Sequence, residues 1–202
     1  MLKKLSKKGL LVFASVLALA AFVTPSMASA ASWGGGATHV LDSSDLNFIN
    51  HAASLGSSCK VNTLHSVVSS AAVLTVTAAT FSGCMGLGTT GGQCTTTPVA
   101  GGLPWTATGL STTNIQIHNI NVTVTYANTP GNPTACPIAG VPVTVTGTLA
   151  SPGHTHWDAL AHQVTLFNAT GVVAHSAALG VAGQPVTING TIRDRTQTLT
   201  LS

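Results

Sequence analysis

The sequence predicts an all-β protein: a single-domain β-sandwich or flattened barrel of about eight or more antiparallel strands, stapled by disulfides. Short runs rich in Val, Ile and Thr recur along the chain, separated by Gly, Pro and Asn turn signals. After the N-terminal segment, no part of the chain keeps a sustained helical period. The roughly 170 residues beyond that segment suit one domain with its own core.

Residues 1–30 have the pattern of a cleaved signal peptide. Four lysines within residues 3–8 form a basic head, residues 9–23 are apolar, and Ala28-Ser29-Ala30 is a small-residue cleavage site. A membrane-anchoring helix is the alternative, but it needs roughly 20 apolar residues and this run is shorter. We therefore expect a secreted protein with no transmembrane span after cleavage.

The chain that remains after cleavage carries few charges. It keeps three of the seven basic residues and all four acidic ones, for a net charge of −1. Ordinary globular domains have about a quarter of their residues charged. Without a basic patch, nucleic-acid binding is disfavoured. Weak repulsion between copies permits self-association, or adhesion to neutral and apolar surfaces such as hydrocarbon or lipid.

Residues 31–58 are expected to form a flexible leader followed by a short helix or loop. Residues 31–36 are small and glycine-rich. Residues 42–57 are the one plausibly helical piece, because a serine could cap them and three apolar residues have rough helical spacing. A loop is the alternative.

The β domain is expected over residues 59–202. Its clearest strand is residues 113–126, in which the apolar parity changes between Ile117 and Ile120. A period of two cannot change faces without an extra residue, so we expect a bulge or bend near His118-Asn119. The other expected strands cover residues 60–64, 72–81, 141–149, 163–167, 172–177, 185–192 and 196–201.

Three local sequences define how these strands should begin and connect. Pro142 cannot donate to a ladder, which places it at an edge strand or a strand end. The sequences 168–171 (Asn-Ala-Thr-Gly) and 193–195 (Arg-Asp-Arg) have the composition of hairpin connections.

The four cysteines are Cys59, Cys84, Cys94 and Cys136. An even number in an exported chain predicts disulfides, with three connectivities open. Cys84 with Cys94 is favoured as a local pair, because nine mostly Gly and Thr residues separate them, and Cys59 with Cys136 then follows. Zinc is the alternative, but no Cys-x-x-Cys spacing is present.

A histidine-rich segment offers the one candidate metal site. On a strand, His154, His156 and Asp158 would project from one face. Two imidazoles and a carboxylate suit a divalent metal. The plainer interpretation is an exposed turn after residues 151–153, since no further acid lies nearby in sequence. We therefore expect no metal and no other cofactor.

Catalytic signatures are missing from the sequence. There is no Gly-x-Ser-x-Gly elbow, no expected free cysteine and no phosphate-binding loop ending in Lys. Glu does not occur anywhere, which removes the usual pair of glycosidase carboxylates unless two Asp serve. We expect a protein that is not an enzyme.

Four aromatic residues are expected in the core, where large rings supply much of the burial. These are Phe81, Trp105, Tyr126 and Phe167. The alternative is that they form an apolar cavity or surface that binds lipid or hydrocarbon.

The sequence Thr77-Ala78-Ala79-Thr80-Phe81-Ser82-Gly83, the following cysteine pair and Gly102-Leu103-Pro104-Trp105-Thr106-Ala107-Thr108 resemble the secreted bacterial "protein activator of alkane oxidation" family. The similarity extends over about residues 59–149. It implies an exported, cysteine-bridged β domain that aids growth on long-chain alkanes by contacting or dispersing the hydrocarbon. No catalytic residues come with the family, and the His-rich C-terminal third departs from it.

The expected function is therefore a secreted, non-enzymatic β protein that contacts or disperses hydrophobic substrates outside the cell. One alternative is a structural subunit of an extracellular or cell-surface polymer, with the C-terminal strand or the small-residue leader as donor. The second alternative is a His-dependent metal-binding protein.

Overall fold

The structure, a computed structural model, describes residues 31–132, 134–150 and 154–202; the predicted signal peptide lies outside them. Over these residues the chain is all-β, as predicted, with no helix and therefore no helix long and apolar enough to cross a membrane. The strands are β1 (Trp33–Gly34), β2 (Thr38–Ser43), β3 (Leu46–Asn50), β4 (Leu55–Ser70), β5 (Val73–Gly88), β6 (Cys94–Ala100), β7 (Trp105–Gly109), β8 (Ile115–Asn128), β9 (Pro142–Leu149), β10 (Thr155–Asp158), β11 (Gln163–Ser176), β12 (Val181–Asp194) and β13 (Thr200–Leu201).

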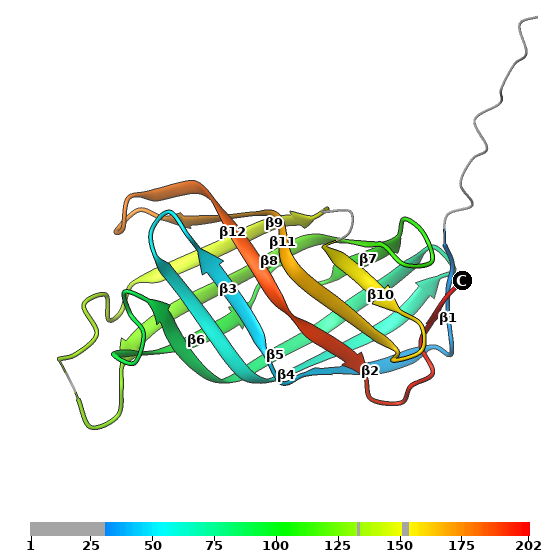
Figure 1. Cartoon of the computed structure of the whole chain (residues 1–202), viewed down its shortest axis with the longest axis horizontal. Coiled ribbons are helices and arrows are strands. Elements are labelled where there is room, and N and C mark those ends of the chain that lie inside the picture. Colours follow the sequence, from blue (N-terminus) through cyan, green and yellow to red (C-terminus); the bar gives the residue numbers. More distant parts are fainter. Residues whose placement is uncertain (1–30, 133, 151–153) are drawn as a thin grey trace, which may run out of the picture.

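The strands close into an antiparallel barrel (Figure 1). Around the wall, β4 pairs with β5, β8 with β9, β9 with β11 and β11 with β12. β12 returns to β4 through β2 and β3, which each pair with both. β6 and β7 follow one another between β5 and β8, and β10 continues the position of β9 beside β11. Closure places the apolar face of every strand inside.

The long strands alternate between the inside and the outside of the barrel, which forms the core. In β8, Val122, Val124 and Tyr126 are buried, whereas Thr123 and Thr125 between them are only partly covered. One connected apolar cluster takes side chains from every part of the wall. The expected parity change in β8 is confirmed: the register shifts between Ile117 and Ile120, and Asn119 takes a left-handed φ of 61°.

The helix or loop expected within residues 42–57 is wrong. Leu46, Phe48 and Asn50 alternate inward along β3, so their spacing follows a period of two. Of the strands before Cys59, β2 and β3 belong to the closed sheet. The glycine-rich leader also contains a strand, because β1 pairs with β13 at one end of the barrel (Figure 1). The two segments expected as donor strands for a polymer thus pair with each other.

The hairpin expected at residues 168–171 is also wrong, because β11 runs through it with two register shifts. Asn168 and Gly171 have positive φ, of 48° and 108°, so these turn-forming residues build bulges rather than a hairpin. A Cβ on Gly171 would lie 2.0 Å from the carbonyl oxygen of Thr148, so only glycine fits there. At residues 193–195, β12 does end, but β13 pairs with β1 and not with β12. Pro142 begins β9, as expected of a strand end.

Candidate functional site: an apolar interior and a nearly uncharged outer wall

The barrel encloses an apolar cavity of about 70 Å³. Its lining comes from all sides of the wall and consists of aliphatic and aromatic side chains alone. Five aromatic residues take part: Trp33, Phe48, Phe81, Trp105 and Trp157. The lining therefore supplies no nucleophile, no acid and no base, and suits a hydrocarbon group.

Two edge-to-face aromatic pairs fix the shape of this lining. The rings of Trp33 and Trp157 lie 5.6 Å apart, and those of Phe48 and Phe81 lie 6.1 Å apart. The indole N–H of Trp33 donates to the Ala107 carbonyl at 3.0 Å. The indole N–H of Trp157 has no hydrogen-bond partner among the described residues.

Of the four aromatic residues predicted to lie in the core, three lie in it or pack against it, and one is exposed. Trp105 and Tyr126 are buried, and Phe81 packs partly buried against the core. Phe167 is 64% exposed, so its assignment to the core is wrong: it lies on the outer side of β11, next to the bulge at Asn168. It stacks there on the imidazole of His154.

Sequence reasoning missed Trp33, Phe48 and Trp157 as lining residues. Trp33 and Phe48 lie in the segment interpreted as leader and helix. Trp157 lies in the histidine-rich segment. The signal available in the sequence was the alternation of polar His156 and Asp158 with Trp157, and in the structure Thr155 and Trp157 are buried while His156 is exposed.

The cavity is small relative to a long hydrocarbon. For comparison, an engineered apolar cavity of about 150 Å³ binds benzene. A volume of about 70 Å³ holds only a fragment of a few carbon atoms. A long-chain alkane therefore cannot be enclosed in this state of the barrel.

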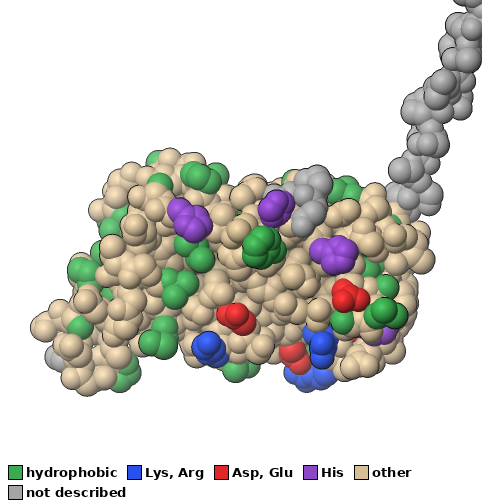
Figure 2. All heavy atoms as spheres, in the orientation of Figure 1, with side chains coloured by type: hydrophobic (Ala, Val, Ile, Leu, Met, Phe, Trp, Pro, Cys, Tyr) green, Lys and Arg blue, Asp and Glu red, His purple; other side chains and the backbone are tan. Residues whose placement is uncertain are grey.

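The outer wall carries few charges. Asp42 and Arg195 neutralise each other through a two-bond contact, with N···O distances of 2.6 and 2.9 Å. The hydrogen bond from Arg195 is the main cause that lowers the pKa of Asp42. On the face shown in Figure 2, uncharged polar side chains and backbone together cover most of the surface, and charged side chains are few. The wall is therefore polar through hydroxyl and amide groups.

Several aliphatic and aromatic side chains project from this wall. Val61 and Val99 are 60% and 59% exposed, and Leu160 is 96% exposed. Met85 and Leu103 are also exposed. Val61, Met85, Val99 and Leu103 all belong to β4, β5, β6 and the loop that follows β6.

The one buried acid has a structural role. Asp194 is fully buried, and its carboxylate accepts hydrogen bonds from the backbone N–H groups of Thr196, Thr198 and Leu199. His39 lies 3.4 Å away, also buried. Burial acts to raise the pKa of Asp194, but these hydrogen bonds outweigh it and lower the pKa below its usual value. The carboxylate thereby holds the segment leading to β13 against the end of the barrel.

All four cysteines form disulfides, but the favoured pairing is wrong. Cys59 bonds Cys84 and Cys94 bonds Cys136. Cys59 and Cys84 are direct register partners on β4 and β5, whereas Met85 and not Cys84 lies near the start of β6. The pairing of the cysteines therefore follows the register of the strands and not their closeness in sequence.

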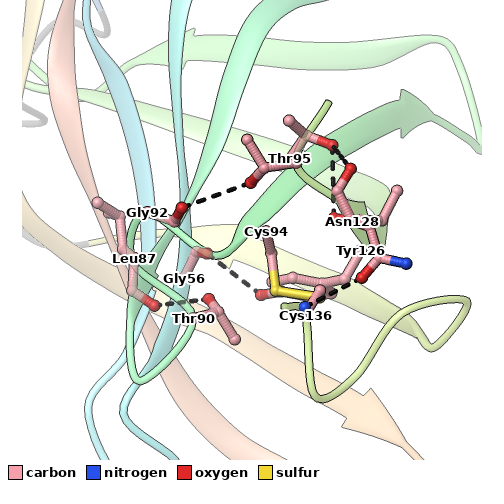
Figure 3. Close-up of a disulfide and its surroundings, with 11 residues drawn as sticks. Gly56, Leu87, Thr90, Gly92, Cys94, Thr95, Tyr126, Asn128 and Cys136 are labelled. Carbon is pink, nitrogen blue, oxygen red and sulfur yellow. Dashed lines mark hydrogen bonds between the residues drawn. A yellow bond between two sulfur atoms is a disulfide. The ribbon is translucent and has the colours of Figure 1, made fainter. Parts of the chain in front are cut away.

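The second disulfide fastens the long loop after β8 to the barrel (Figure 3). The Asn128 side chain accepts a bond from the backbone N–H of Cys136 at 3.0 Å. Beside it, the buried Tyr126 hydroxyl donates to the Gly56 carbonyl. This end of the barrel is thus closed by covalent and polar contacts.

The candidate metal residues are not brought together as a site. His154 and His156 point to solvent, and Asp158 caps the turn by accepting from the backbone N–H groups of Leu160 and Ala161. Within the described ranges, no three His, Cys, Asp or Glu side chains are placed to hold a metal.

Fold and site together define a disulfide-bonded antiparallel barrel with a wholly apolar interior and a nearly uncharged outer wall. The chain belongs to the alkane oxidation protein activator PraA/PraB-like family, whose model matches residues 6–155. This confirms the resemblance found in the sequence and connects the protein with the activation of alkane oxidation. No curated protein and no solved structure matched the chain.

Proposed function

We propose that this protein is exported and acts outside the cell, without catalysis, by contacting and dispersing hydrocarbon. The observation that carries the proposal is the outer wall, which combines very few charges with projecting aliphatic side chains. Membership of an alkane oxidation activator family supports a hydrocarbon as the partner. Two disulfides and no free cysteine in the described chain support an oxidising, extracellular compartment.

Adsorption to hydrocarbon is favourable for such a surface because its apolar side chains can leave water without desolvation of neighbouring charged groups. Burying one exposed Val, Leu or Phe contributes about 1.5–3 kcal/mol. Desolvating an unpaired charge would cost several kcal/mol or more. Outer hydroxyls limit their own desolvation by pairing, as Thr123 and Thr144 do at 3.2 Å.

The closed, cross-linked sheet also suits work at an interface. A protein that unfolds at oil exposes its core and is lost to aggregation. The wall closes on itself around the barrel, and the two disulfides restrain the unfolded state. We therefore expect adsorption of the folded protein.

The test is emulsification of hexadecane by purified, oxidised protein, measured as droplet size and as interfacial tension. Wild type at micromolar concentration should lower both. The double variant Leu160→Ser with Phe167→Ser should be weaker, while Thr165→Ser, a neighbouring polar change on β11, serves as the matched control. No effect of wild type on droplet size or tension would reject the proposed function.

A further inference from the structure

We propose that the apolar cavity opens sideways through a seam between β5 and β6, and that the end of an unbranched alkyl chain enters there. The seam comprises residues 77–83 of β5 and 96–100 of β6. This inference rests on the proposed contact with hydrocarbon. It adds where on the barrel a single alkyl chain is held, and how.

The backbone ladder is interrupted at the seam. β5 and β6 share one register pair, Met85 with Thr95, although β6 pairs with β8 along its whole length. The N–H of Gly101 donates to Asn121 on β8. Because successive strand residues direct their N–H groups to opposite sides, the nitrogen of Pro98 faces β5. Proline has no hydrogen to donate, so β6 is an edge towards β5.

The inner side of the seam is apolar and incompletely covered. Seven hydrophobic residues of the described chain pack against the core only partly buried, and three of them, Ala79, Phe81 and Ala100, lie at the seam. Ala79 and Phe81 come from the seam segment of β5, and Ala100 comes from that of β6. Phe81 also lines the cavity. Phe81 and Ile117 are the two lining residues that are only partly buried, and Phe81 is the one that lies beside the interrupted ladder, so we place the mouth of the cavity at Phe81.

The outer side of the seam carries exposed aliphatic side chains. Val99 lies within the β6 segment, and Leu103 lies in the loop after it. Val61 is the register partner of Ser82 in the β5 segment, and Met85 lies two residues after the end of that segment. An apolar path thus runs from the outer wall to the cavity.

Polar contacts close both ends of the barrel. At one end, the β1–β13 sheet carries the buried Trp33, and the buried Asp194, with His39 3.4 Å away, accepts from the backbone of the segment that leads to β13. At the other end, Tyr126 bonds Gly56 beside the Cys94–Cys136 disulfide (Figure 3). An apolar chain entering by either end would have to displace buried polar groups, which the lateral seam does not require.

The occupant follows from the size and chemistry of the cavity. The lining has no charged, hydroxyl or carboxamide side chain to bind a polar head group. A volume of about 70 Å³ is less than half that of a cavity of about 150 Å³ that binds benzene, which favours the narrow end of an unbranched chain over a ring. The rest of a long alkane would lie outside, along Val99 and Leu103.

The direct test is photolabelling of the full, oxidised protein with a dodecyl chain that carries a terminal diazirine. Peptide mapping should find the label on the segments that contain Ala79, Phe81 and Ala100, and excess n-dodecane should remove it. Label on β1, on β13 or on the loop closed by Cys136 would overturn the seam as the mouth.

Blocking variants give a second readout. Each buried methylene contributes about fourfold in affinity, so Ala79→Trp, by keeping two methylenes out, should weaken binding of the dodecyl probe about fifteenfold. Ala161→Trp enlarges another partly buried alanine, in the β10–β11 turn, and should change affinity less than about twofold. If Ala79→Trp does not fold, the milder Ala100→Leu replaces it. Unchanged affinity in a folded seam variant overturns the inference.

The two proposals fail in different ways. Emulsification of hexadecane with label outside the seam would refute the seam while leaving the proposed function in place. Loss of both emulsification and competable labelling would refute the proposed function itself.

Discussion

Replacing Asp194 by Asn tests how the C-terminal segment is held against the barrel. The carboxylate is fully buried and accepts from the N–H groups of Thr198 and Leu199 at 2.8 Å each, and from the hydroxyl of Thr196 at 3.0 Å. An Asn side chain keeps the shape but has one acceptor oxygen. Its NH₂ group would then face a backbone N–H.

The expected loss follows from these contacts. A hydrogen bond to a charged group is worth about 1.5–3 kcal/mol, and a buried donor left unpaired costs about 1–3 kcal/mol. We expect Asp194→Asn to lower the free energy of unfolding by about 3 kcal/mol at pH 7. For a domain of this size, that corresponds to a fall in Tm of about 6–12 °C.

The pH dependence has a defined sign. The folded-state pKa of Asp194 is lowered, so the stability that it supplies is complete above the unfolded pKa of about 4. That stability is lost as the pH falls towards the folded pKa. The gap in Tm between wild type and Asp194→Asn should therefore be largest near neutral pH and narrow below pH 4.

Thermal unfolding followed by circular dichroism, without reductant, measures this effect. Asp158→Asn is the matched control, because Asp158 caps a turn at the surface and its loss should cost about 1 kcal/mol or less. A loss below about 1 kcal/mol for Asp194→Asn would refute the reasoning.

Three further predictions concern other parts of the molecule. Burial raises the pKa of Tyr126 to about 12, and because this is the one tyrosine, its absorbance should titrate near that value while the fold persists. The stability that the neutral phenol supplies is then lost as the pH rises from about 10 towards 12, and a midpoint near 10 in folded protein would contradict the burial. Non-reducing peptide mapping should recover the pairs Cys59–Cys84 and Cys94–Cys136. On the chain-entropy model, replacing the first pair by Ala should lower the free energy of unfolding in urea by about 3.5 kcal/mol, and replacing the second by about 4 kcal/mol. Equal stability with and without a pair would reject that estimate. Phe167→Ser should change the free energy of unfolding by less than about 0.5 kcal/mol, since the ring is exposed, and a large loss would place it in the core after all.

The sequence predicted strands best where alternation runs long and uninterrupted. The parity change in β8 could be located to His118-Asn119 because a bulge is a local consequence of the two-residue period. β3 could not be recognised, because its five residues offer only two inward apolar side chains, Leu46 and Phe48. The bulges at Asn168 and Gly171 have the composition of a turn, and composition alone does not separate the two.

The interior site was harder to predict, since it depends on which strands become neighbours. Cys84 and Cys94 are close in sequence, yet the register of β4 with β5 decides the pairing. Trp33 reaches the cavity only because β1 folds over the end of the barrel with β13. The seam likewise needs the three-dimensional pairing pattern, although Pro98 could have signalled a weak ladder.

The two proposed contacts with hydrocarbon make separable demands on the surface. Adsorption to a droplet draws on every exposed apolar side chain, including Phe167 and Leu160, which lie away from the seam. Holding one chain end requires only the seam and the cavity behind it. Phe167→Ser should therefore weaken adsorption without changing where the dodecyl probe labels, whereas Ala79→Trp should weaken labelling at the seam and leave adsorption nearly intact. If both variants changed both readouts together, a single apolar surface would account for all contact with hydrocarbon, and the cavity would be a packing defect of the core.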